Sequence, residues 1–142
     1  MVKFIILCFF LILNGCSSLK KNFVDCPKVI APKKAAEVIV KSENKLPVYI
    51  GFRGIKPYCI KIDDAIEMEI SVNIRAIRKE TEIEDFVPVN ISIVSTDFNN
   101  KEYERDNFSY SQFLLKGSRI VDRATIFDIK IPKGGQVYLG LK

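Results

Sequence analysis

No histidine occurs among the 142 residues of this sequence. Without an imidazole, the chain has no Ser-His-Asp or Cys-His triad, no histidine general base and no histidine metal site. It also has no glycine-rich phosphate loop, because Gly134 and Gly135 follow an expected strand and do not open a helix. These absences exclude whole classes of enzyme. We therefore expect a protein without catalytic residues, metal or cofactor.

A strong excess of one charge is also lacking. The 22 Lys and Arg residues stand against 17 Asp and Glu, which gives a net charge of +5. Such a mild excess favours contact with anionic lipid headgroups or cell-wall polymers. It is too diffuse to indicate a nucleic-acid partner. The chain length suits one domain with a modest core, and no repeat or low-complexity tract is present.

The chain begins with a short apolar run that follows Lys3. Residues 4–13 (FIILCFFLIL) are too few to span a bilayer, which takes about twenty residues, but they suit the core of a secretory signal. Residues 13–16 (LNGC) resemble the lipobox of a bacterial lipoprotein signal peptide, although Asn14 is less usual there than Ala or Ser. The resemblance implies cleavage before Cys16 and lipidation of that residue. The alternatives are an uncleaved membrane anchor and a chance apolar start.

The lipoprotein resemblance also implies a location. Ser17 stands where Asp would be the familiar signal for retention in the inner membrane, which favours the outer membrane and a domain that faces the periplasm. Acyl chains contribute roughly 0.8 kcal/mol per buried methylene, so the membrane would be a permanent partner. We expect a signal peptide at residues 1–15, a lipidated tether at residues 16–25 and one domain at residues 26–142.

Two cysteines remain once Cys8 is removed with the signal and Cys16 is acylated. Cys26 and Cys59 are then an even pair in an oxidising compartment, and we predict a disulfide between them. The alternative is a redox-active or metal-binding pair. Neither thioredoxin chemistry nor an ordinary zinc site is supported, since the chain has no Cys-x-x-Cys spacing and no histidine.

The mature region is dominated by strand signals. Residues 66–76 alternate apolar and polar side chains, as a strand with one buried face does. The other expected strands are residues 46–60 with a bend or bulge, 87–96, 101–110, 119–131 and 136–142, and residues 36–41 form a short strand or a turn of helix. Residues 78–85 are a charged connection, and Asn99-Asn100 suits the centre of a two-residue hairpin turn. This pattern predicts an all-β fold, an antiparallel immunoglobulin-like sandwich of about seven strands.

The mature region resembles a set of short uncharacterised outer-membrane lipoproteins from alphaproteobacteria. The resemblance rests on residues 26–29 (CPKV), Cys59, residues 87–89 (VPV), residues 131–132 (IP) and residues 137–141 (VYLGL). It implies the paired cysteines and the sandwich fold. It implies no activity.

Two surfaces are candidates for function. The hairpin after residue 100 would expose an aromatic and basic surface, for which the residues are Tyr103, Arg105, Phe108 and Tyr110. Aromatic and Arg side chains anchor many interfaces, although half of these four would serve to cap the core. A group of acids, Asp63, Asp64, Glu67 and Glu69, precedes and lines one strand. Solvated acids on the wet face of a strand are the ordinary interpretation of this group.

Two functional hypotheses follow from these surfaces. The first is a non-enzymatic accessory or adaptor to an envelope protein complex, which binds its partner through a sheet edge or the aromatic surface. The second is a cell-wall glycan binder or a glycan hydrolase that depends on the carboxylates of residues 63–69. Carboxylates that converge in a cleft would favour the second hypothesis.

Overall fold

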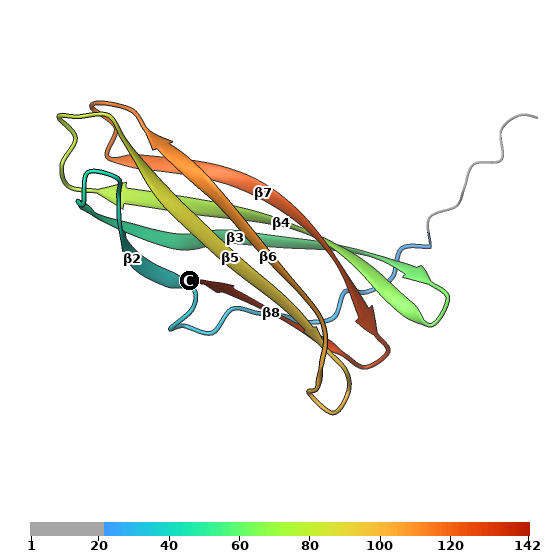
Figure 1. Cartoon of the computed structure of the whole chain (residues 1–142). Helices are drawn as coiled ribbons and strands as arrows, with labels where there is room; N and C mark the ends of the chain where they lie inside the picture. The colour runs from blue at the N-terminus through green and yellow to red at the C-terminus, as the bar shows by residue number, and fades with distance from the viewer. Residues whose placement is uncertain (1–21) are drawn as a thin grey trace, which may run out of the picture.

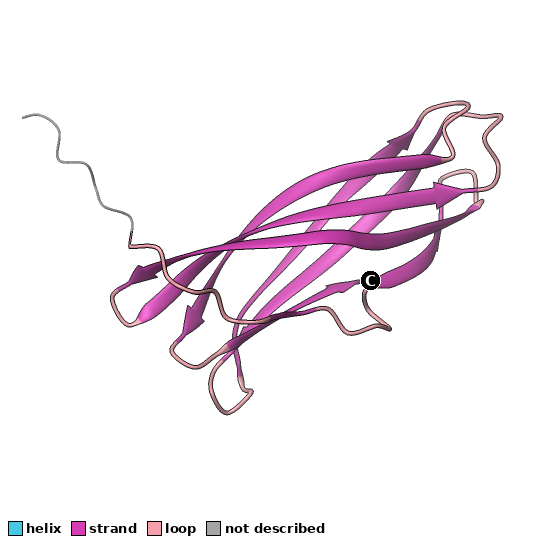
Figure 2. Ribbon diagram, turned by 180° about the vertical axis from the view of Figure 1, so that it is seen from behind, coloured by secondary structure: helices cyan, strands magenta, loops and turns pink. Residues whose placement is uncertain are grey.

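Eight β-strands and no helix make up residues 22–142, the part of the chain that the structure, a computed structural model, describes (Figures 1 and 2). The expected all-β sandwich is confirmed, with eight strands instead of about seven. The strands are β1 (Val29–Ile30), β2 (Glu37–Lys41), β3 (Pro47–Ile62), β4 (Ala65–Arg78), β5 (Asp85–Thr96), β6 (Glu102–Leu114), β7 (Ile120–Pro132) and β8 (Gln136–Leu141).

The strands form two four-stranded layers. Sheet A has the order β2-β3-β4-β7 and sheet B has the order β1-β8-β5-β6. The alternating apolar residues of β4, β5, β7 and β8 point between the sheets, where burying their side chains contributes most of the driving force for folding. Met68, Ile70 and Val72 of β4, for example, have no exposed surface, as their parity predicted.

One flank of the sandwich is covered by the N-terminal segment, residues 22–41. Val24 donates a hydrogen bond to the Cys59 carbonyl and Lys61 donates one to the Asn22 carbonyl, so the segment lies along β3 where β2 does not reach. It then crosses to sheet B, where β1 pairs with β8 in the one parallel pairing of the described chain. It returns to sheet A as β2. The sandwich thus includes Asn22, four residues before the expected domain start.

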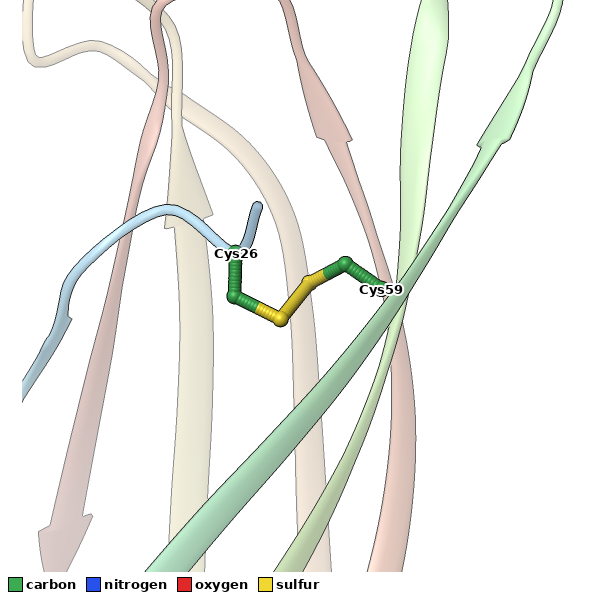
Figure 3. The surroundings of a disulfide bond; sticks show 2 residues. All are labelled: Cys26 and Cys59. Carbon is green, nitrogen blue, oxygen red and sulfur yellow. A yellow bond between two sulfur atoms is a disulfide. The ribbon is translucent and has the colours of Figure 1, made fainter. Parts of the chain in front are cut away.

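The predicted disulfide between Cys26 and Cys59 is confirmed. Figure 3 shows the bridge joining the N-terminal segment to β3, with the two Cα atoms 5.3 Å apart. Cys59 is buried in the core. The bridge therefore fixes the covering segment to sheet A at the point where the described chain begins.

Several local predictions have clear outcomes. Residues 37–41 form a strand, and β3 carries its expected irregularity between Phe52 and Gly54. The prediction of a two-residue turn centred on Asn99-Asn100 is wrong. The Asn100 amide donates a hydrogen bond to the Asp97 carbonyl, so Phe98 and Asn99 occupy the turn centre. Asn100 follows with φ of 61°, and the Asp97 carboxylate accepts from two loop amides, which favours this longer loop.

The charged connection at residues 78–85 is also shorter than predicted. Arg78 ends β4 and Asp85 begins β5, and both side chains are buried. The charges did not indicate this burial, because it depends on hydrogen-bond partners that lie far away in the sequence.

Residues 1–21 lie outside the described residues. This range includes the expected signal peptide and the lipidation site at Cys16. Within residues 22–142, no helix has the length and apolar character needed to cross a membrane.

Replacing Cys26 and Cys59 together by serine should lower the free energy of unfolding by about 3 to 4 kcal/mol, because the bridge closes a loop of 33 residues in the unfolded chain. Urea unfolding of the variant and the oxidised protein measures the difference. The protein in reductant should behave like the variant. A difference below about 1 kcal/mol would contradict the expected role of the bridge.

Candidate functional site

The four residues of the expected partner surface lie on β6, the edge strand of sheet B, but they do not form one surface. Arg105 pairs with Val94, whose side chain lies on the outer face of sheet B. Phe108 pairs with Ile91 and therefore has the parity of the core-facing residues. The predicted surface is divided between the outside and the flank of the sandwich.

Phe108 and Tyr110 connect the two sheets along the open flank, where β6 and β7 are the edge strands. The Phe108 ring meets the Phe127 ring of β7 edge to face, with centroids 5.5 Å apart. The Arg123 guanidinium lies 4.1 Å from the centroid of the Tyr110 ring. Burial raises the pKa of Tyr110, although Arg123 acts in the opposite direction. These two aromatic residues therefore pack against β7 and cap the core.

Arg105 forms hydrogen bonds with a residue of its own strand and with one of β5. Its guanidinium donates to both carboxylate oxygens of Glu102 and to the Ser92 hydroxyl. The hydrogen bonds from Arg105 hold the pKa of Glu102 below its ordinary value. Tyr103 is well exposed, but it faces a different set of residues near the β3–β4 turn.

The acids of residues 63–69 do converge on shallow hollows. On the outer face of sheet A, Tyr58, Glu69 and Asp128 occupy one row across β3, β4 and β7. Ile60 and Glu67 occupy the next row. Together with Phe23, which bridges to Ile60, these residues line a hollow of about 300 Å³.

A second hollow adjoins the first through Glu67, which lines both. It has a volume of about 400 Å³ and lies between the β3–β4 turn and the start of β6. Its other lining residues are Ile62, Asp63, Asp64, Ala65, Tyr103, Lys130 and Pro132. We call the two spaces the acidic hollows.

The chemistry of the acidic hollows suits hydroxyl-bearing or cationic ligands. Carboxylates accept hydrogen bonds from hydroxyl groups, and the exposed rings of Phe23, Tyr58 and Tyr103 offer apolar faces beside them. Glu69 lies directly opposite Asp128, and such like-charged pairs are unfavourable in a sheet. Within residues 22–142, no group of three or more Asp, Glu or Cys side chains is placed to hold a metal ion.

A third surface lies at the end of the sandwich formed by the β4–β5 and β6–β7 loops, which is opposite the end where the described chain begins (Figure 1). There the Phe86 and Phe113 rings contact each other on the outer face of sheet B, with centroids 5.0 Å apart and planes tilted by 42°. Ile83 and Leu115, in the loops next to these strands, are 44% and 53% exposed. Phe86 and Phe113 are themselves about 40% exposed. We call these four residues the distal patch.

The distal patch is supported from beneath by Arg78. The buried guanidinium donates hydrogen bonds to the carbonyls of Ile83 at 2.8 Å and Leu115 at 2.7 Å, and to the Ser118 carbonyl. It thereby ties together the two loops that carry the aliphatic residues of the patch. These hydrogen bonds hold the two loops in fixed positions relative to each other.

Asp85 holds the neighbouring turn in the same way. Its carboxylate accepts hydrogen bonds from the backbone amides of Phe86 and Asn44. Burial raises the pKa of Asp85, but hydrogen bonds from Ser42, Phe86 and Asn44 outweigh this effect and keep the pKa below its ordinary value. The Asp85 carboxylate is therefore ionised at neutral pH, and it accepts these hydrogen bonds in its charged form.

No protein-family model, curated protein or solved structure matches the chain.

Sequence reasoning missed the distal patch. Ile83 and Leu115 stand in charged loops with no periodicity, and Phe86 has the polar-face parity of its strand. One signal was available, because an aromatic residue at an outward position departs from strict alternation. Asp128 of the acidic hollows was also missed, since only the pairing of β4 with β7 brings it beside Glu69.

Proposed function

We propose that this chain is a lipid-anchored, non-enzymatic adaptor of the bacterial envelope. In this proposal Cys16 holds it at the outer membrane, the sandwich faces the periplasm, and the distal patch binds a folded envelope protein. The lipobox resemblance supports the anchor. The described chain begins six residues after Cys16, a distance of at most about 20 Å when extended, which would keep the Asn22 end near the membrane.

The distal patch is the observation that carries the adaptor proposal. Contiguous exposed apolar residues rimmed by polar ones are typical of protein interaction sites. Here two aromatic rings on β5 and β6, and two aliphatic side chains on the loops that Arg78 holds, lie at the end opposite the expected anchor. A partner with an apolar surface of its own would bury them.

A photo-crosslinking residue in place of Phe113 should give one discrete adduct with an envelope protein in intact cells. The same residue in place of Phe98 should give none, because Phe98 is 74% exposed but lies in the β5–β6 turn, at the other end of these strands from the patch. Denaturing gels followed by mass spectrometry measure both outcomes.

Phe86→Asp should abolish the Phe113 adduct, since a charge in a desolvated apolar contact is strongly unfavourable. Cys16→Ser should remove the lipid and leave the signal peptide uncleaved, which mass spectrometry detects as an intact amino terminus. Equal adducts from both positions, or none from position 113, would contradict the adaptor proposal.

The acidic hollows support a second candidate function, the binding of cell-wall glycan. The supporting observation is the row of Tyr58, Glu69 and Asp128, in which an aromatic face adjoins two carboxylates. This combination matches the hydroxyl groups and apolar faces of a sugar chain. A carboxylate-dependent hydrolase would use the same surface.

Under this second candidate, Glu67→Gln together with Glu69→Gln should weaken binding to isolated cell wall about tenfold or more. Glu80→Gln with Glu82→Gln is the matched control, because these exposed acids lie in the loop at the other end of the sandwich and their loss changes the net charge equally. Co-sedimentation with cell wall measures the binding. Equal weakening by both pairs, or by neither, would remove the glycan candidate.

A further inference from the structure

The outer edge of β7 carries backbone groups that nothing in the described chain covers. β7 is the last strand of sheet A and pairs only with β4. The Lys130 amide points away from β4, since it donates to the Glu104 carboxylate of β6 at 2.7 Å. Backbone groups alternate in direction along a strand, so the amides of Ala124, Ile126 and Asp128 point the same way. No hydrogen-bond partner for these three amides is present among residues 22–142.

The two flanks of the sandwich therefore differ in how far their edge backbone groups are hydrogen-bonded. The N-terminal segment covers the flank at β3 and β8, where amides such as Leu141 and Phe52 donate to the carbonyls of Ala35 and Ala36. On the open flank, Glu104 caps one amide of β7, and nothing among residues 22–142 caps the amides of Ala124, Ile126 and Asp128. Natural proteins usually block long edge strands, because a bare edge pairs with another strand.

The two charged side chains four residues either side of Ile126 have opposite signs. Ile126 is 61% exposed on the outer face of sheet A. Asp122 lies four residues before it and Lys130 four residues after it, on the same face. In an antiparallel pairing of β7 with another β7 centred on Ile126, each Asp122, which also accepts hydrogen bonds at 2.7 Å from Arg75 of its own chain, lies opposite a Lys130.

We propose that two copies of this chain pair through β7, antiparallel, about a two-fold axis at Ile126. Ile126 then lies opposite itself, and Ala124 lies opposite Asp128 of the second copy. The outward amides and carbonyls of these residues bond across the axis, and Glu104 ends the ladder at Lys130. If the axis moves to residue 125, Asp122 lies opposite Asp128 of the second copy. If it moves to residue 127, Ile126 lies opposite Asp128. Both shifted registers lose the Asp122–Lys130 pairing.

The pairing also determines where the two distal patches lie. A two-fold axis normal to sheet A leaves the outer faces of both sheets B on the same side of the pair. Phe86 and Phe113 of each copy lie on that face. The pair thus presents two distal patches on one face, at opposite ends of the pair because the two copies are antiparallel, and the pairing itself does not depend on what the patches bind.

Cross-linking of the full chain in intact envelopes tests the pairing. Ile126→Cys places two thiols on the axis, where the Cα atoms of a hydrogen-bonded pair are about 5.5 Å apart, within disulfide range. Mild oxidation should double the mass of most of the chain on a non-reducing gel. Ala124→Cys should not link, because its two copies are offset by about 14 Å along the strands. Ala124→Cys with Asp128→Cys should link again.

Ile126→Pro is the variant that separates pairing from folding. It removes an amide that faces away from β4, so the strand and the unfolding midpoint should be preserved. The dissociation constant for its self-association in detergent, measured by sedimentation equilibrium, should be at least about tenfold higher than that of the unaltered chain. The Phe113 adduct should persist, which distinguishes failure of the pairing from failure of the adaptor function.

Three results would overturn the pairing. The first is equal cross-linking of Ile126→Cys and Ala124→Cys. The second is unchanged self-association of Ile126→Pro. The third is an Ile126→Cys adduct with a different protein and no self-linked species, which would assign the edge of β7 to a foreign strand.

Discussion

The edges of the two sheets impose the main constraint on this fold, because every backbone group along an edge needs a partner or water. A sandwich of two open sheets has two flanks, each with two edges. Here the N-terminal segment satisfies one flank by pairing with β3 and β8 in turn, and the Cys26–Cys59 bridge fixes it there. The core is left with only the β6 and β7 flank to close by side-chain contacts such as Phe108 on Phe127.

This arrangement separates four regions of the molecule. The covered flank leads to Asn22 and to the expected anchor. The open flank leaves the β7 edge for pairing. The distal patch rests on loops that Arg78 holds through their carbonyls, and the acidic hollows occupy the outer face of sheet A near the first described residues. The distal patch shares no residue with the other surfaces, whereas Asp128 and Lys130 belong both to the acidic hollows and to the outward row of β7.

Local pattern was sufficient to predict the strands whose one face is buried. Residues 66–76, 87–93 and 137–141 alternate strictly, and the structure buries the apolar parity of each. Pattern failed where long-range pairing decides the outcome. β1 is two residues long and exists only because β8 lies beside it. In the sequence, Arg78 and Asp85 look like exposed charges of a linker. Only the structure shows the backbone groups to which their buried side chains are hydrogen-bonded. The turn at residue 97 depends on a side-chain carboxylate that outweighs the Asn-Asn signal.

The central claim is that the N-terminal segment, held by the disulfide, closes one flank of the sandwich. Native-state hydrogen exchange of single amides tests it most directly, with the bridge intact and after reduction. The account predicts slow exchange at Val24, Phe52 and Leu141 in the oxidised protein, and much faster exchange at these amides after reduction while Ile74 of β4 stays slow. Fast exchange at Val24 and Leu141 with the bridge intact, or no change on reduction, would contradict it.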